Sequence, residues 1–230
     1  KKTFENLAYA GGFDSFKSSH RAQYFYLDSE GTPFIERVLR FGSKFQENKK
    51  SSQMNLFGEQ SDNVYQVLKL PDCLEFGNLE RLKNEKEVVG IYISAHPLDD
   101  FKKEIELFKT LELNFLKDLK PLLKKTFFVA GIVNSVEHLE AKNGNLWGKF
   151  IIEDFKDQYE FKIFGEEYLK FRHFLIVDQF VRVKILIREG WTNRETGKVG
   201  DPRIQFIKFE MLQNTIRDNS EKITLTIDIN

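Results

Sequence analysis

The strongest constraint on the fold of this chain is a change in the spacing of its apolar residues at Thr126. From Thr126 to Met211 apolar and polar residues alternate, whereas earlier segments repeat their apolar residues every three or four positions. A period of two is typical of β-strands with one buried face, and a period near 3.6 is typical of helices. We therefore expect a helical first half followed by a β-sheet domain.

Five strands are expected in the second half. Their predicted ranges are 126–136, 147–153, 159–164, 180–188 and 203–211. Asn143 and Gly144 suit the turn between the first two strands, and a short helix is expected at 166–174. Three strands, a helix and two more strands is the order of an OB-fold, a five-stranded barrel that binds nucleic-acid strands. The predicted fold class is α+β, with a helix-hairpin-helix-like region and then an OB-fold barrel at 126–215.

Alternation also predicts which barrel side chains face outward. The outward aromatic and basic side chains, with those of the loop after the fourth strand, form a candidate DNA-binding surface: Trp147, Lys149, Lys162, Arg182, Lys184, Arg188, Trp191 and Arg194. Aromatic rings can stack on bases while cations hold phosphates. The alternative for Trp147 is packing against a neighbouring domain.

The charge balance limits how strongly such a surface can attract DNA. The whole chain has 35 basic and 35 acidic residues, and between Thr126 and Met211 8 Lys and 5 Arg are balanced by 13 acidic residues. Phosphate attraction must then come from local clustering. Single-strand binding by the barrel is therefore expected to be weak and strongly salt-dependent.

The first fifty residues are predicted to be helical. Apolar residues recur at helical spacing in residues 4–10, and Asp14 or Ser15 is expected to cap a second helix that includes residues 20–25. Two helices joined by a glycine-containing turn suggest a helix-hairpin-helix at 1–50, which holds DNA phosphates on backbone N–H groups. An ordinary helix pair is the alternative.

A helical connector is predicted at 61–125, and it contains the only residues that suggest catalysis. His96, Asp99 and Asp100 are possible metal ligands, although acidic residues at a helix start are already favoured by the helix dipole. Cys73 with a histidine is a possible nucleophile pair, but nothing in the spacing fixes their distance. We therefore predict neither catalytic residues nor metal ligands here.

The composition indicates a soluble cytoplasmic protein. There is one cysteine, which excludes an internal disulfide and fits a reducing compartment. No apolar run approaches the roughly 20 residues of a membrane span. The chain begins at Lys1 without a signal peptide, which suggests a fragment of a longer protein.

A short apolar pair stands in polar surroundings at 51–60. The sequence there reads Gln53-Met-Asn55-Leu56-Phe57, with charged or polar residues on both sides. Such a pair either packs on its own domain or is offered to a partner. The pattern Gln-x-x-Leu-Phe resembles the peptide by which bacterial replication proteins bind the sliding DNA clamp, where Leu and Phe fill an apolar pocket and Gln supplies hydrogen bonds.

Two longer stretches extend this resemblance over nearly the whole chain. Residues 85–98 read Glu-Lys-Glu-Val-Val-Gly-Ile-Tyr-Ile-Ser-Ala-His-Pro-Leu, and residues 8–16 are followed by His20-Arg21. With the clamp peptide and the barrel in the same order, the chain resembles the C-terminal half of the alpha subunit of bacterial DNA polymerase III, a C-family replicative polymerase.

The resemblance implies roles for particular segments. Gln53, Leu56 and Phe57 match the clamp-binding residues, and Asn55 stands where the family often has Asp or Ser. The barrel would receive the single-stranded template, and residues 216–230 would be a tail or the start of a domain that binds the clamp-loader subunit tau. The implied partners are the sliding clamp (the beta subunit), single-stranded and duplex DNA, and tau.

The resemblance places the polymerase chemistry outside this chain. The family's three metal-binding aspartates would lie before Lys1, so this chain is expected to bind no catalytic magnesium and to extend no primer, while the parent protein would need Mg²⁺. The alternative function is an OB-fold module that binds RNA, of the anticodon-binding type. It explains the barrel but leaves the helical half and the peptide without a role.

Overall fold

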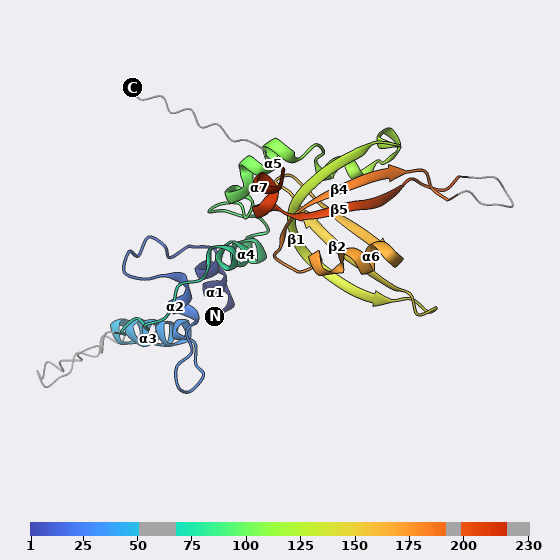
Figure 1. Cartoon of the computed structure of the whole chain (residues 1–230). Coiled ribbons are helices and arrows are strands. Elements are labelled where there is room, and N and C mark those ends of the chain that lie inside the picture. The colour runs from blue at the N-terminus through green and yellow to red at the C-terminus, as the bar shows by residue number, and fades with distance from the viewer. Residues whose placement is uncertain (51–67, 192–198, 220–230) are drawn as a thin grey trace, which may run out of the picture. The chain divides into compact units, whose positions relative to one another are not determined.

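The computed structural model describes residues 1–50, 68–191 and 199–219 of the chain (Figure 1). The chain divides into two compact units, Lys1–His96 and Pro97–Asn230. We call them the helical unit and the barrel unit. Their boundary falls inside the range 61–125 that the sequence assigned to a single connector.

In residues 1–50 and 68–96, the helical unit contains four short-to-medium helices. They are α1 (Lys2–Tyr9), α2 (Arg21–Phe25), α3 (Phe34–Lys50) and α4 (Asn78–Val89). Helix α1 packs on α2 and α4, and α2 packs on α3. The buried apolar side chains are few: Ala8, Ala22, Phe34, Ile35 and Leu82. This unit therefore has a small apolar core.

Two details of the helical unit differ from the prediction. The second helix begins at Arg21 with His20 as its N-cap, so the expected cap at Asp14 or Ser15 is wrong. Asp14 instead binds the guanidinium of Arg21. Helix α3 lies within the range 1–50 but was not one of the two helices predicted there, because its exposed polar residues obscure its apolar face.

The described residues of the barrel unit form one antiparallel sheet of five strands. They are β1 (Thr126–Glu140), β2 (Leu146–Glu153), β3 (Gln158–Phe164), β4 (Phe180–Arg188) and β5 (Arg203–Met211). The order across the sheet is β3-β2-β1-β4-β5, so the long strand β1 pairs with both β2 and β4 (Figure 1). With α6 (Gly165–Phe171) between β3 and β4, this is the OB-fold arrangement. The sheet is not closed by pairing between β3 and β5, so the barrel is open along these two edges.

Short helices cover the ends of the sheet. Besides α6 they are α5 (Lys102–Phe108), α7 (Thr215–Asn219) and the 3-10 turns Asp99–Phe101, Leu113–Lys117, Lys120–Leu122, Arg172–Phe174 and Leu212–Asn214. The predicted ranges of the last two strands are confirmed, and β1 is longer than predicted because its pairing with β2 continues to Glu140.

The inner faces of the strands form the core of the barrel unit. Phe150 and Ile152 of β2 and Phe161 and Ile163 of β3 are buried, as their alternation predicts. The Phe150 ring stacks on Phe161 at 5.3 Å between centroids. This core is large and aromatic, unlike that of the helical unit.

Strand β1 comes very close to β2 at Gly131. A Cβ atom at Gly131 would lie 2.2 Å from the carbonyl oxygen of Glu153, so only glycine allows this approach. The register with β2 shifts between Val133 and Ser135. This irregularity lies a few residues after Gly131.

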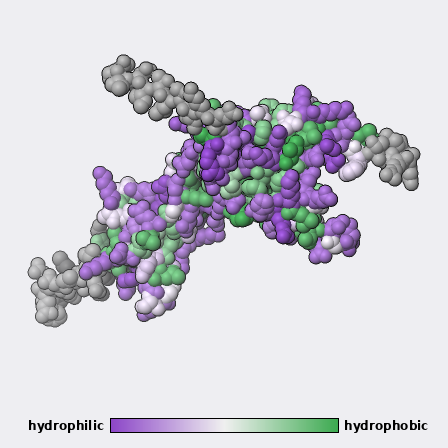
Figure 2. All heavy atoms as spheres, in the orientation of Figure 1, coloured by the Kyte–Doolittle hydropathy of each residue, from purple (hydrophilic) through white to green (hydrophobic). Residues whose placement is uncertain are grey.

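Two properties of the surface complete the description. No helix in the described ranges is long and apolar enough to span a lipid bilayer. On the face shown in Figure 2, hydrophilic residues cover much of both units, with hydrophobic residues scattered among them.

Candidate nucleic-acid interface

The outer face of β2 and β3 carries an aromatic pair. Trp147 and Phe164 are cross-strand neighbours, and their rings stack at 5.3 Å between centroids and 17° between planes. Phe164 is 57% exposed. The side chain that packs on Trp147 thus belongs to the same barrel. Together the two rings offer a stacking surface of the kind that single-strand-binding proteins use.

Two predicted lysines lie on the same face, and both are already paired with carboxylates. The Lys149 ammonium lies 2.7 Å from Glu137 and 3.8 Å from Glu160, and Lys162 lies 3.7 Å from Glu160. The Glu137 hydrogen bond is the main reason that the pKa of Lys149 is raised. A phosphate would have to replace these carboxylates as the partner of each lysine.

Arg182 is a correction to the predicted surface. Alternation placed it on the outer face of β4, but it is only 5% exposed. Its guanidinium donates to Glu210 (2.8 Å) and to the carbonyl of Phe108 (3.1 Å), and it lies 3.7 Å from the centroid of the Phe128 ring. Burial lowers the pKa of Arg182, against the opposing effect of Glu210. This arginine is a structural group, because α5 covers that part of the sheet.

The other two predicted residues of β4, Lys184 and Arg188, are at least partly exposed. Lys184 is half-buried, 5.4 Å from the Phe128 ring and opposite Lys208 on β5. Arg188 is exposed and lies opposite Arg203. Across the sheet, β1 separates β4 from β2 and β3, which carry the Trp147–Phe164 pair. The eight predicted residues therefore do not form one patch.

Trp191 follows β4 and is 77% exposed. The sequence associated it with Arg188 and Arg194; among the described residues, the guanidinium of Arg203 lies over its ring, 4.3 Å from the centroid. Sequence reasoning missed Arg203 and Phe164. Strand register could have found both, because Phe164 faces Trp147 and Arg203 faces Arg188.

The predicted clamp-binding residues lie outside the described part of the chain. These are Gln53, Asn55, Leu56 and Phe57, and Arg194 also lies outside. The structure therefore neither supports nor opposes the roles assigned to them.

The helical unit contains a buried network of charged side chains. The guanidinium of Arg21 donates to the carboxylates of Asp14 and Glu85, each at 2.6 Å. Glu85 is fully buried, and it also accepts hydrogen bonds from the backbone N–H groups of Ile93 (3.1 Å) and Ser94 (2.9 Å) and from the Ser94 hydroxyl. This network ties α2 to α4 and to the segment after α4.

The network depends on the negative charge of Glu85. Burial alone would raise the pKa of this carboxyl group, but the hydrogen bonds from Ser94, Arg21 and Ile93 outweigh it and lower the pKa to about 2. A Cβ atom at Gly11 would lie 2.3 Å from the Arg21 guanidinium, so this glycine makes room for the arginine.

Neither catalytic alternative is supported by the geometry. In residues 1–50, 68–191 and 199–219, no group of three or more His, Cys, Asp or Glu side chains is arranged to hold a metal ion. Burial raises the pKa of Cys73, which disfavours the thiolate that a nucleophile needs.

Comparison with known proteins identifies relatives over most of the chain. No protein-family model matches it. The DNA polymerase III subunit alpha of Borreliella burgdorferi is 33% identical over 186 residues, which cover 80% of this chain and 15% of that protein. Over most of its length the chain is similar to DNA polymerase III alpha subunits. The alpha subunit of Campylobacter jejuni is 30% identical over 168 residues, and that of Pseudomonas fluorescens is 25% identical over 195.

The chain is thus related to one segment of a much longer alpha subunit. It spans about 15% of the length of the curated relatives that it matches. Solved structures add little to this. The mitochondrial single-stranded DNA-binding protein Rim1 of S. cerevisiae is 18% identical with a TM-score of 0.25, over 38% of this chain and 91% of Rim1. RecG bound to a three-way DNA junction is 16% identical with a TM-score of 0.27, over 94% and 31%. Scores this low carry no argument about function.

The two stretches that resemble alpha subunits meet in the buried network. Asp14 and Arg21 come from the first stretch, and Glu85 and Ser94 come from the second. These motif residues therefore hold the helical unit together.

Proposed function

We propose that this chain is the DNA-guiding and clamp-binding region of a DNA polymerase III alpha subunit. The barrel would bind the single-stranded template, and the peptide at 53–57 would tether the polymerase to the sliding clamp. Similarity to alpha subunits over most of the chain supports the assignment to replication, and it also accounts for the helical half, which an RNA-binding barrel leaves unexplained. The observation that carries DNA binding is the stack of half-buried Trp147 on exposed Phe164, beside Lys149 and Lys162.

The proposed mode of binding combines stacking with exchange of ionic partners. A base stacks on the Trp147–Phe164 pair, and such stacking contributes about 1–3 kcal/mol per base. The neighbouring phosphates take the place of Glu137 and Glu160 at the two lysines. Because Lys149 and Lys162 exchange carboxylate partners for phosphates, they contribute little net binding free energy. The resulting weak grip suits a template that has to move through the site.

Salt dependence tests the lysines. We expect Lys149→Gln with Lys162→Gln to lower the slope of log affinity against log salt by about 1.4, since each single-strand phosphate contact contributes about 0.7. Fluorescence anisotropy with a labelled oligonucleotide measures this slope. Lys117→Gln with Lys156→Gln is a matched control, because these lysines are also ion-paired. An unchanged slope and affinity in the first variant would refute the assignment of this face.

Clamp binding is tested through the apolar pair. Leu56→Ala with Phe57→Ala is expected to abolish binding to the clamp of the same organism in a pulldown, without lowering the melting temperature. Met54→Ala serves as the control within the same peptide. Loss of stability in the double variant would mean that the pair packs on its own domain. A clamp that still binds the double variant would remove the peptide from the proposal.

Other parts of the subunit would make the phosphodiester bonds. Mg²⁺ and the catalytic aspartates belong to those parts in this proposal. The helical unit would contact duplex DNA, and the segment 216–230 would lead toward the tau-binding domain. The physical role of this chain is then to hold the polymerase on the DNA and to position the template. Tethering to the clamp makes each rebinding of the polymerase to DNA intramolecular, at an effective concentration of about mM order.

A further inference from the structure

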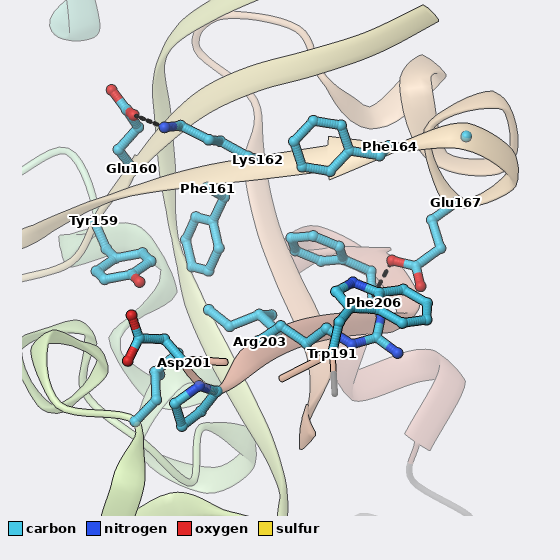
Figure 3. A pocket seen from close by; sticks show the side chains of 14 residues that line it. Tyr159, Glu160, Phe161, Lys162, Phe164, Glu167, Trp191, Asp201, Arg203 and Phe206 are labelled. Carbon is cyan, nitrogen blue, oxygen red and sulfur yellow. Dashed lines mark hydrogen bonds and ion pairs between the residues drawn. The ribbon is translucent and has the colours of Figure 1, made fainter. Parts of the chain in front are cut away.

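A pocket of about 690 Å³ lies along the open side of the barrel, between the edges of β3 and β5. This size is within the roughly 300–1,000 Å³ of small-ligand sites. Figure 3 shows side chains of β3 on one side of it and Trp191, Arg203 and Phe206 on the other. The Trp147–Phe164 stack touches this pocket only through Phe164.

At the pocket, the guanidinium of Arg203 packs on the Trp191 ring but leaves most of the ring exposed. The guanidinium of Arg203 lies 4.3 Å from the centroid of the Trp191 ring, yet 77% of Trp191 is exposed. The Nε atom of Arg203 is buried and has no hydrogen-bond partner among the residues that the structure describes. A buried donor without a partner is costly, so this atom indicates a place where an acceptor is expected.

A second feature, a pair of arginines where β4 ends and β5 begins, favours an anionic ligand nearby. Arg203 lies directly opposite Arg188 across the β4–β5 ladder. Like charges in directly opposed positions destabilise a strand pair. A phosphate near the exposed Arg188 would relieve this repulsion.

The lining of the pocket decides which part of a nucleotide can enter it. Glu160, Glu167 and Asp201 all line it, and these carboxylates oppose the entry of a phosphate. The rings of Phe164 and Phe206 line it as well and suit a planar aromatic group. The chemistry therefore fits a base inside and phosphates at the mouth.

We propose that this pocket takes one unstacked base of the bound single strand, held against Trp191 and Arg203. The proposal rests on the single-strand binding proposed above and adds a second contact point to it. The acceptor edge of the base faces the Arg203 Nε, and the adjoining phosphate lies toward Arg188. Because every base has an aromatic face, the site is tolerant of sequence.

Photo-cross-linking locates the base directly. Oligonucleotides with 5-iodouracil at each position in turn are bound to the full chain, irradiated and digested with trypsin. Trp191 then lies in peptide 189–194, and Trp147 lies in peptide 143–149. Cross-links in both peptides are expected. Cross-links in 143–149 alone would overturn the pocket and leave the proposed function intact, whereas no binding of the oligonucleotide at all would overturn both.

Affinity gives a second test that does not depend on photochemistry. Trp191→Ala is expected to weaken single-strand binding about five- to tenfold, and Trp191→Phe is expected to restore most of it. Phe115→Ala, which removes a ring of the same unit that is 56% exposed and lies outside the pocket, is expected to leave the affinity unchanged. Equal affinities of Trp191→Ala and the wild-type chain would overturn the proposal.

Discussion

Different interactions stabilise the interiors of the two units of this chain. The helical unit buries few apolar side chains and is joined at its centre by Asp14, Arg21, Glu85 and Ser94. The barrel unit is held by a continuous cluster of aromatic and aliphatic residues, and the outward Lys149 and its carboxylates lie on the surface. A buried network of charges is therefore central to the helical unit, whereas in the barrel unit the buried Arg182–Glu210 pair accompanies a much larger apolar core.

This difference decides what substitutions and pH do to each unit. Both tryptophans belong to the barrel unit, so tryptophan fluorescence follows the barrel alone. Circular dichroism at a helical wavelength follows mainly the helical unit. The two signals allow the stability of each unit to be measured in the same sample.

The largest effect is expected from the core of the barrel. Phe150→Ala should lower the free energy of unfolding of the barrel by about 3–5 kcal/mol, because it leaves a cavity beside Phe161, Phe206 and Phe209. Denaturant titration followed by tryptophan fluorescence measures this. Ile151→Ala on the outer face is the control. A helical signal that shifts equally would mean that the two units unfold together.

A similar effect is expected in the helical unit when its network is broken. Glu85→Ala leaves the buried charge of Arg21 without one of its partners, which typically costs about 3–5 kcal/mol. Circular dichroism should show an earlier transition while the fluorescence midpoint stays in place. Glu80→Ala on the exposed side of α4 should change stability by no more than about 0.5 kcal/mol. If both variants behave alike, the network is not what holds the unit.

Acid should weaken the helical unit before the barrel. The folded-state pKa of Glu85 is about 2, below its ordinary value of 4.5. Its contribution, on the order of 3 kcal/mol, is present above pH 4.5 and is lost as the pH falls toward 2. Denaturant midpoints measured between these pH values test this. A helical unit whose stability stays constant over that range would contradict the lowered pKa.

The smallest effect on stability is expected at the surface. Lys149→Gln breaks ion pairs with Glu137 and Glu160 that water can replace, so the barrel should lose less than about 1 kcal/mol. Thermal unfolding measures this loss. A larger loss would show that the outer-face ion pairs stabilise the barrel. It would then be wrong that the barrel unit depends mainly on its apolar core.

The sequence predicted the barrel better than the helical unit, for a physical reason. Strand alternation is local, so neighbouring residues reveal the faces of β2 and β3. Arg21 and Glu85 meet only through the tertiary fold, and neither segment alone indicates the pairing. The error at Arg182 has the same origin: alternation gives the face of the sheet, but not that α5 covers it.

The site was predictable in part. The outward positions of Trp147, Lys149 and Lys162 follow from alternation, and Phe164 and Arg203 follow from cross-strand register once the hairpins are drawn. The pocket between β3 and β5 depends on how far the barrel closes, which no local pattern encodes.

Binding of a fluorescein-labelled single strand to the full chain tests the central claim most directly. We expect saturable binding at about 50 mM salt that weakens steeply as salt is added, and weaker binding when Trp147 and Phe164 are both replaced by Leu. No binding at low salt, or equal binding by that double variant, would contradict the claim that this barrel holds a nucleic-acid strand on its β2–β3 face.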